Sequence, residues 1–323
     1  MIVVQYTQPH SHTLTMAITQ TNLDGILPLV ARGKVRDIYE VDAQTLLFVA
    51  TDRISAYDVV MSNPVPDKGR LLTQLSEFWF QFLHEDVRNH LFPIAEGKTM
   101  WDYLPAALSA DEKYRSQLEG RSLLVRRFRL VPLEVIVRGY ITGSAWKEYT
   151  QHGTVHGVVQ ENKSLKESEQ LPTPVFTPST KADQGEHDEN ITVQQAEDLV
   201  GKELCDRVAK LAVGLYTKCR DYAASRGIII ADTKFEFGID DATDEIILVD
   251  EVLTPDSSRF WSGKEYAPGQ SQDSYDKQFL RDWLTANKLA GVPDVAMPED
   301  IVTRTRAKYI EAYETLTGEK YNV

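Results

Sequence analysis

Residues Ile228–Trp261 read IIIADTKFEFGIDDATDEIILVDEVLTPDSSRFW: an apolar run, an acidic turn, a second apolar run and a polar loop. This order predicts a β-hairpin, because apolar runs of strand length flank a cluster of turn-forming residues. Side chains alternate along a strand, so Asp232, Lys234 and Glu236 share one face of the first strand. Asp250 ends the second strand. The hairpin therefore gathers four charged side chains in one region.

The acidic pair of this hairpin predicts a site for a divalent cation. If the turn is centred on Thr243, Glu236 lies directly opposite Asp250, with a Cβ separation of about 5 Å. Like charges at that distance repel unless a cation lies between them. Hard ions such as Mg²⁺ bind carboxylate oxygens together with substrate phosphates. The alternative is a solvated hairpin edge, which the apolar flanks Ile228–Ala231 and Ile246–Val249 disfavour because they predict burial.

Composition limits both the architecture and the partners. The chain of 323 residues is long enough for two lobes. Its net charge of −13 argues against a general surface for nucleic acid or anionic membranes. Cys205 and Cys219 fall on one predicted helix, about 21 Å apart, so they cannot pair and they indicate a reducing compartment. Without an apolar run of about 20 residues or a signal peptide, we expect a cytoplasmic protein.

The N-terminal third contains a small β-meander, Leu27–Asp58, in which Gly33 and Lys34 form a turn. Such a turn can approach phosphates through backbone N–H groups, although a Gly-Lys turn is usually only a turn. The polar run Thr51–Asp58 follows a buried-looking strand, and capping with local salt bridges is the favoured interpretation. The apolar stripe in Leu71–Leu91 predicts a helix.

A candidate anion site follows in the middle of the chain. Leu123–Arg138 predicts two strands broken by Pro132, and Gly139–Ser144 predicts a turn bounded by glycines. An arginine at a strand end beside a Gly-Ser loop suits a phosphate or a carboxylate. A structural contact between Glu134 and Arg138 is an equally good interpretation of the same residues.

The remaining chain predicts one long loop and three helices. Gln151–Asn190 is polar and contains prolines, which is typical of a lid or binding loop. A capping box at Thr192–Gln195 begins the first helix. Lys277 and Arg281 lie one turn apart on the same face of the second helix. The predicted helices have the bounds 192–226, 274–288 and 299–316.

Several short motifs together resemble the SAICAR synthetase family, the phosphoribosylaminoimidazole-succinocarboxamide synthases. Leu130–Ser144 resembles one family signature and Ile230–Gly238 the second. Gly33–Tyr39 is similar to the nucleotide loop of the family, and Asp250–Arg259 to its metal and substrate loop. The likeness runs from about Asn22 to the C-terminus. The chain resembles the longer single-function form of the family, in which residues 176–191 would be the extended loop.

The resemblance implies a two-lobed α+β fold of the kinase-like and ATP-grasp-like type. Residues 1–20 would be an N-terminal tail, 21–125 a small antiparallel nucleotide-binding lobe, and 126–323 a larger substrate- and metal-binding lobe with C-terminal helices. The implied reaction, a step of purine biosynthesis, joins L-aspartate to the carboxylate of carboxyaminoimidazole ribonucleotide. ATP is converted to ADP and phosphate, and the expected path runs through an acyl phosphate with Mg²⁺ bound.

The resemblance also implies a role for each motif residue. Phosphoryl transfer needs positioning and charge neutralisation more than a protein nucleophile. The metal ligands would be Glu236 and Asp250, and the catalytic residues would be Asp232, Lys234 and Arg259. The ATP-binding residues would be Gly33, Lys34, Arg36 and Lys181. The substrate-binding residues would be Arg138, Ser144, Ser258, Arg259, Lys277 and Arg281.

Two other functions fit some of these residues. A small-molecule kinase would use the same metal hairpin, and ADP release that depends on aspartate separates the two enzymes. A non-catalytic binder of a phosphorylated metabolite gains nothing from opposed carboxylates, so Glu236 and Asp250 count against it. We expect ATP, the ribonucleotide and L-aspartate as partners, without nucleic acid or membrane, and a monomeric protein.

Overall fold

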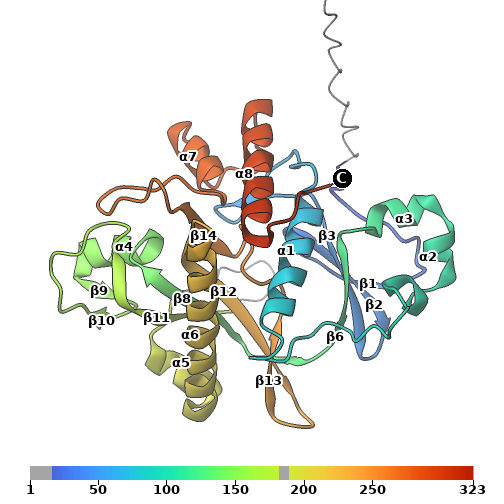
Figure 1. Ribbon diagram of the computed structural model, residues 1–323, viewed down its shortest axis with the longest axis horizontal. Helices are drawn as coiled ribbons and strands as arrows, with labels where there is room; N and C mark the ends of the chain where they lie inside the picture. Colours follow the sequence, from blue (N-terminus) through green and yellow to red (C-terminus); the bar gives the residue numbers. More distant parts are fainter. Residues whose placement is uncertain (1–16, 182–188, 323) are drawn as a thin grey trace, which may run out of the picture.

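The computed structural model describes residues 17–181 and 189–322. Residues 1–16 of the predicted tail and 182–188 of the predicted extended loop therefore lie outside the described residues. Two bodies lie side by side, a small antiparallel sheet with short helices and a larger sheet covered by long helices (Figure 1). The expected α+β class is confirmed. In the described ranges, no helix is long and apolar enough to cross a membrane.

Fourteen strands occur in the described residues. Their bounds are β1 Leu29–Arg32, β2 Arg36–Asp42, β3 Thr45–Ala50, β4 Ser55–Ala56, β5 Val59–Val60, β6 Ser122–Arg126, β7 Arg129–Leu130, β8 Leu133–Tyr140, β9 Thr154–Val155, β10 Val158–Val159, β11 Gln170–Thr180, β12 Ile228–Asp240, β13 Glu245–Val249 and β14 Ser258–Ser262. The small sheet has the order β1-β2-β3-β6, and the large sheet β11-β8-β12-β13. Strands β14 and β7 also pair with β12, which is therefore the central strand.

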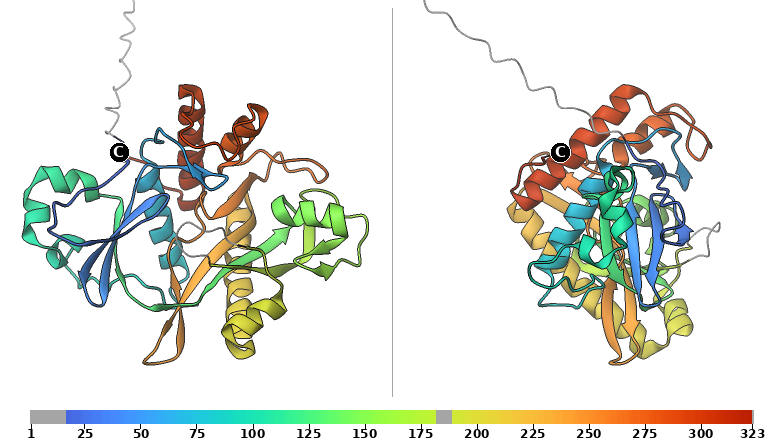
Figure 2. Two further views of the ribbon diagram at one scale, coloured as in Figure 1. Left: turned by 180° about the vertical axis from the view of Figure 1, so that it is seen from behind. Right: turned by 90° about the vertical axis from the view of Figure 1, so that its right-hand side faces the viewer.

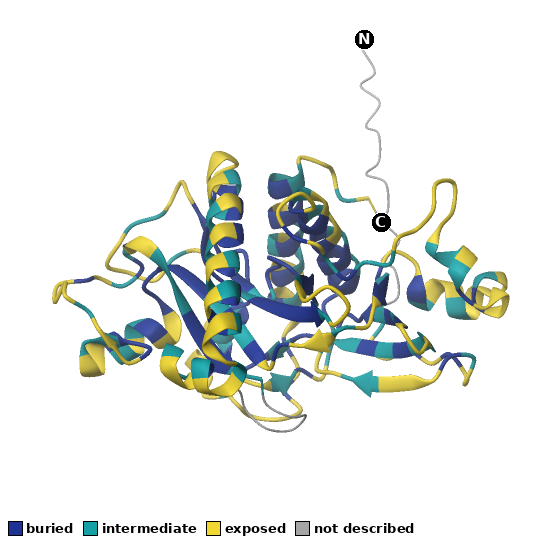
Figure 3. Ribbon diagram, turned by 90° about the horizontal axis from the view of Figure 1, so that it is seen from below, coloured by how far each residue is buried: buried dark blue, intermediate teal, exposed yellow. Residues whose placement is uncertain are grey.

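The helices surround these sheets. Their bounds are α1 Lys68–Phe82, the 3-10 helix η1 Met100–Tyr103, α2 Ala106–Ala110, α3 Glu112–Leu118, α4 Gly143–His152, α5 Val193–Val200, α6 Lys202–Ser225, α7 Gln278–Ala286 and α8 Glu299–Thr317. Helix α6 runs across the large sheet, and α1 and α8 pack together beside it (Figure 2). Burial is concentrated in the strands and inner helix faces, while the outer helix faces are exposed (Figure 3).

The main core crosses the predicted lobe boundary. It contains Leu75 and Trp79 of α1 together with Val135 of β8 and Phe237 of β12. Helix α1 belongs by sequence to residues 21–125, yet its apolar face packs on the sheet of the larger body. A separate core lies under the small sheet and its short helices. The division at residues 125 and 126 stays a prediction.

The hairpin register differs from the prediction by one residue. Glu236 pairs with Val249, and the turn is a four-residue loop between Asp240 and Glu245. Asp250 lies just beyond β13 in a left-handed conformation, with φ 66°. The direct pairing of Glu236 with Asp250 was therefore wrong. The turn sequence is equally compatible with a four-residue loop, and a shift of one residue reverses which side chains face each other.

Three segment predictions were also wrong in extent. The helix predicted to Leu91 ends at Phe82, because residues 88–92 form backbone hydrogen bonds with the two sheets. The helix predicted over 192–226 has the expected capping box but breaks at Gly201, whose φ of 85° is left-handed. The turn expected at Gly139–Ser144 is the end of β8 and the start of α4.

The long loop predicted at Gln151–Asn190 contains a strand of the large sheet. Residues Gln170–Thr180 form β11, which pairs with β8 at the sheet edge. Its prolines suggested a loop, because proline cannot donate a ladder hydrogen bond. An edge strand tolerates proline when the missing N–H would face away from the neighbouring strand. The sequence shows the prolines but not the position of the strand in its sheet.

Candidate active site

One pocket lies between the small sheet and the end of β13. It has a volume of about 290 Å³, and its lining combines apolar and charged side chains. The lining residues are Val30, Ala31, Ile38, Leu46, Phe48, His90, Arg126, Arg127, Phe128, Leu130, Lys181, Glu236, Val249 and Asp250. We call the pair Glu236 and Asp250, with the pocket beside it, the carboxylate-rich end of the site; the cationic partners of the pair are Arg36, Lys181 and Lys234.

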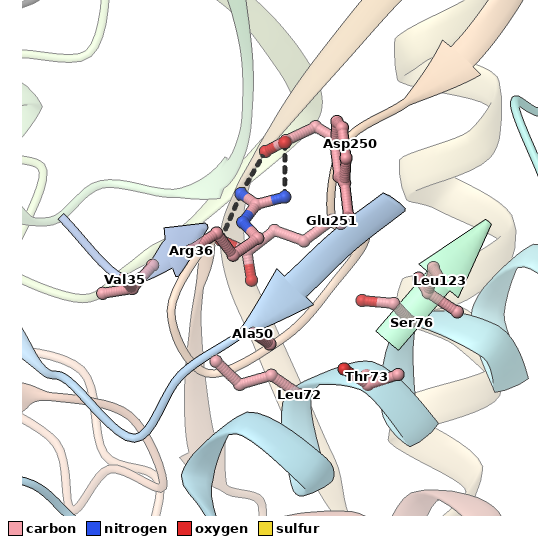
Figure 4. A pocket seen from close by; sticks show the side chains of 10 residues that line it. Val35, Arg36, Ala50, Leu72, Thr73, Ser76, Leu123, Asp250 and Glu251 are labelled. Atoms are coloured by element: carbon pink, nitrogen blue, oxygen red, sulfur yellow. Dashed lines mark hydrogen bonds and ion pairs between the residues drawn. The ribbon is translucent and has the colours of Figure 1, made fainter. Parts of the chain in front are cut away.

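Asp250 is held by an arginine from the small sheet. Arg36 forms a two-pronged contact with its carboxylate, of which the Nη2–Oδ2 distance is 2.6 Å, and also lies 3.6 Å from Glu251 (Figure 4). Burial alone would raise the pKa of Asp250, but the adjacent guanidinium lowers it well below its ordinary value. Asp250 is therefore a half-buried, ionised group at neutral pH.

Glu236 is held by two lysines. Lys234 Nζ lies 2.7 Å from Glu236 and 2.7 Å from Glu134, and Lys181 also bonds Glu236. Burial and the nearby Asp250 would raise the pKa of Glu236, but Lys234 and Lys181 lower it overall. Burial would lower the pKa of Lys234, but the two glutamates raise it above its usual value. Lys234 is therefore charged at neutral pH, which suits positioning rather than general-base catalysis.

A second pocket, of about 510 Å³, lies between the turn after β1, the β4–β5 hairpin and the start of α7. Its lining residues are Lys34, Ser55, Ala56, Tyr57, Asp58, Gly143, Ser144, Arg259, Lys277, Gln278 and Arg281. Four of them are cationic, so we call Lys34, Arg259, Lys277 and Arg281 the cation-rich end of the site. This end suits phosphate and carboxylate groups.

Strand β12 connects the two ends. Asp232 lies four residues before Glu236 on the same strand, which corresponds to about 13 Å. Its Oδ2 accepts a 2.7 Å hydrogen bond from Arg138 and is also bonded by Arg259. Arg138 is almost fully buried and contacts Ser144 Oγ at 3.2 Å. Asp232 raises the pKa of Arg259, whereas burial lowers the pKa of Arg138, which Asp232 partly offsets.

Gly143 allows this arginine arrangement. Its φ is +58°, and an added Cβ would lie 2.4 Å from Arg259 Nη2. A side chain at this position would therefore displace the guanidinium and strain the backbone. The Gly-Ser pair predicted as a phosphate loop lies directly beside Arg259.

Lys277 is positioned by a buried network that the sequence did not reveal. Asp256 Oδ2 lies 2.7 Å from Lys68 Nζ and 3.3 Å from Lys277 Nζ, and Tyr309 donates a 2.8 Å hydrogen bond to Oδ1. Burial lowers the pKa of Lys277, which Asp256 partly offsets. These residues come from four separate segments, so no local motif could group them.

The structure brings most of the predicted site residues to the two ends. Ser258 is an exception, since its hydroxyl bonds Thr233 at 2.8 Å and it lies outside the lining of either pocket. The alternative contact between Glu134 and Arg138 was wrong. Those side chains instead bond Lys234 and Asp232, because β8 pairs with β12 and places both opposite the charged face of that strand.

The donor set at the carboxylate-rich end fits a hard cation. Among residues 17–181 and 189–322, no group of three or more His, Cys, Asp or Glu side chains is placed to hold a metal. Two carboxylates, Glu236 and Asp250, nevertheless line one pocket. Mg²⁺ is usually bound by one or two carboxylates, with substrate phosphates and water supplying the remaining ligands. The pair is therefore sufficient for Mg²⁺ bound together with a nucleotide.

Comparison with known proteins identifies the family. The model of the family described as SAICAR synthetase matches residues 29–298. The chain belongs to the SAICAR synthetase family. The phosphoribosylaminoimidazole-succinocarboxamide synthase of Saccharomyces cerevisiae is 74% identical over 307 residues, which covers 95% of this chain and 100% of the relative. The resemblance stated from the motifs is confirmed, and the protein is a ligase of this family.

Solved structures of the family have the same fold. A SAICAR synthase from Saccharomyces cerevisiae, complexed with SAICAR, matches with a TM-score of 0.89 at 72% identity, over 95% of this chain and 100% of that chain. A SAICAR synthetase in complex with ADP matches with a TM-score of 0.65 at 26% identity, over 91% of this chain and 99% of that chain. The two-lobed SAICAR synthetase fold expected from the motifs is thereby confirmed.

Proposed function

We propose that the protein joins L-aspartate to the carboxylate of carboxyaminoimidazole ribonucleotide and converts ATP to ADP and phosphate. The observation that carries this proposal is the pair of differently charged ends connected by β12. One end has two ionised carboxylates suited to a metal-nucleotide complex, and the other has four cations suited to anionic substrates. Relatives of the family include one complexed with SAICAR and one with ADP.

We assign the nucleotide to the carboxylate-rich end. Its apolar side chains would cover the base, while Arg36 and Lys181 would meet the phosphates. Gly33 lines neither pocket and Lys34 lines the cation-rich end, so these two predicted ATP-binding residues would reach the phosphates from that side. Glu236 and Asp250 would hold Mg²⁺, which supplies positive charge between the ATP phosphates and the substrate carboxylate. Arg36 and Lys181 now bond those carboxylates, so they already lie where phosphates would accompany the ion.

We assign the ribonucleotide and aspartate to the cation-rich end. Arg259, Lys277 and Arg281 would bind phosphate and carboxylate groups, with Ser144 beside them. Asp232 would hold Arg138 and Arg259 in place. Ser258 would help to fix β14, which carries Arg259, through its hydrogen bond with Thr233.

In the proposed reaction, an oxygen of the substrate carboxylate attacks the γ-phosphorus and ADP leaves. The aspartate amine then attacks the acyl carbon, phosphate leaves, and the nitrogen loses a proton as the amide forms. The charged Lys234 would stabilise negative charge near the reacting carboxylate.

The decisive assay supplies MgATP, the carboxylated ribonucleotide and L-aspartate, and then omits each in turn. We expect ADP and the amide product only when all three are present. Equal ADP formation without aspartate, and no amide, would indicate a small-molecule kinase instead. Binding of the ribonucleotide without any ADP formation would indicate a non-catalytic phosphometabolite binder.

We also propose that the protein is a monomer in the cytoplasm. Size-exclusion chromatography with light scattering tests the first statement, and a mass near 36.6 kDa is the expected result. Cell fractionation followed by immunodetection tests the second.

A further inference from the structure

The polar run Thr51–Asp58 divides into a structural half and a half that lines the cation-rich end. Asp52 is buried and bonds Arg121 at 3.0 and 3.1 Å, as the capping and salt-bridge interpretation predicts. Tyr57 and Asp58, by contrast, form the two-residue turn between β4 and β5 and line the 510 Å³ pocket. The proposed function above gives these two residues no role.

This turn is held in an unfavourable backbone conformation. Tyr57 has φ 51° and Asp58 has φ 62°, both in the left-handed region that two-residue hairpin turns require. Glycine or asparagine usually fills such positions, and a tyrosine there is strained. Strained residues persist where the surrounding structure fixes them, and they concentrate at ligand sites.

The hairpin is fixed to the helix that carries Arg281. The Tyr57 hydroxyl lies 2.9 Å from Thr285 Oγ1 on α7. Beneath the turn, Ile54 and Ala56 pack in one apolar cluster with Leu280 and Leu284 of α7. The hairpin and α7 therefore hold opposite walls of the pocket at a set separation.

Asp58 is the only carboxylate among the described residues that line this pocket. A carboxylate facing a pocket for anionic substrates weakens their binding unless a ligand brings a positive charge. Of the three substrates, only L-aspartate carries a cationic group, its α-ammonium. ATP and the ribonucleotide are anionic.

We propose that Asp58 binds the α-ammonium group of L-aspartate while the cation-rich end binds its carboxylates. This inference rests on the proposed function. In the structure Asp58 is paired with Lys34, and the two side chains are 55% and 49% exposed. Ion pairs between such exposed side chains contribute little free energy. Replacing the ammonium of Lys34 by the α-ammonium of aspartate would therefore cost little. Lys34 would then turn to a substrate phosphate.

The test compares L-aspartate with succinate, which has the same two carboxylates and no amine. Asp58→Asn keeps the left-handed turn, because asparagine adopts that conformation readily. We expect the KM for aspartate to rise at least about tenfold, since a charge-assisted contact is lost. The inhibition constant of succinate should stay the same or fall, because a repulsive charge is removed. The affinity for the ribonucleotide should not change.

The control is Asp294→Asn, another exposed aspartate with left-handed φ, 58°, that lies outside the pocket lining. It should leave both constants at their wild-type values. Tyr57→Phe, which removes the contact with Thr285, should raise the aspartate KM by a smaller factor.

Parallel changes for aspartate and succinate in Asp58→Asn, or no change in either, would overturn the role of Asp58. Calorimetric titration of both acids into the variant, with ADP and ribonucleotide bound, gives the same comparison without turnover. If the proposed function itself is wrong, the wild-type protein will form no amide product, which distinguishes that failure from a wrong role for Asp58.

Discussion

At the carboxylate-rich end, the buried Glu236 and the half-buried Asp250 are each bonded by a cation from another segment of the chain. At the cation-rich end, four cations surround a pocket whose described lining contains one carboxylate. Both ends lie along β12, and at each end like charges lie close together although each is paired with an opposite charge. Glu236 and Asp250 repel each other, and so do Lys277 and Arg281.

The difference fits the ligands proposed for each end. Two repelling carboxylates are stabilised by a cation, while a cluster of arginines and lysines is stabilised by anions. A protein of net charge −13 thus holds anionic substrates by concentrating a few cations in one pocket. Substitutions at each end should therefore affect different measured constants.

The largest effect is expected for Asp250→Asn. This change removes a proposed metal ligand and leaves Arg36 without its main partner. We expect kcat to fall by about a thousandfold, because charge stabilisation in the transition state is lost. The affinity for the ribonucleotide, measured by calorimetry, should stay near the wild-type value. The matched control Asp241→Asn, on the exposed hairpin turn, should leave kcat at its wild-type value. An unchanged rate in Asp250→Asn would remove this residue from the metal site.

Lys277→Ala should give the opposite pattern at the cation-rich end. The KM for the ribonucleotide or for aspartate should rise about tenfold, since one charged contact is lost. The apparent affinity for ATP should change little. Lys68 and Tyr309 still satisfy Asp256, so the fold should be retained, which circular dichroism can check. Unchanged affinities for both substrates would contradict a binding role for Lys277.

Gly143→Ala tests whether the position of Arg259 matters more than its charge. The new methyl group would displace the guanidinium, so we expect a several-fold rise in the ribonucleotide KM with all charges retained. Gly214→Ala is the control, because its added Cβ would have no heavy atom within 4 Å. That helical substitution should raise the thermal midpoint slightly. Equal behaviour of the two variants would show that Arg259 needs no precise placement.

The smallest effect on activity is expected at His90, which lines the carboxylate-rich end. Burial lowers the pKa of His90 to about 4. The unfolded chain therefore takes up a proton below about pH 6.5, and the folded protein only near pH 4. Stability should fall as the pH drops through this interval, by up to about 3 kcal/mol from this group.

In His90→Gln, the thermal midpoint should fall less steeply as the pH drops through this interval. Some decrease should remain, because His156 is also buried and its pKa is also lowered. Asp250 and Glu236 have lowered pKa values and contribute stability that is lost only in more acidic solution. An identical slope above pH 4 in wild type and variant would mean that His90 titrates normally.

Local pattern was a good guide where one segment carries the information. The period of two placed Asp232, Lys234 and Glu236 on one strand face, and the capping box at Thr192 is present. Prediction from local pattern failed where two segments of the chain must be aligned with each other. The hairpin register differs from the predicted one by one residue, and the predicted loop contains β11, since proline content does not show which strand lies at an edge.

The sequence by itself determined the family, the reaction class and the charged groups of the motifs, because each motif is contiguous and its residue types carry the chemistry. Only the tertiary structure decided how those charges are paired. Arg36 meets Asp250 from another sheet, and Lys68 and Tyr309 meet Asp256 from two helices. Such contacts depend on how β12 is surrounded, and packing across distant segments sets that arrangement.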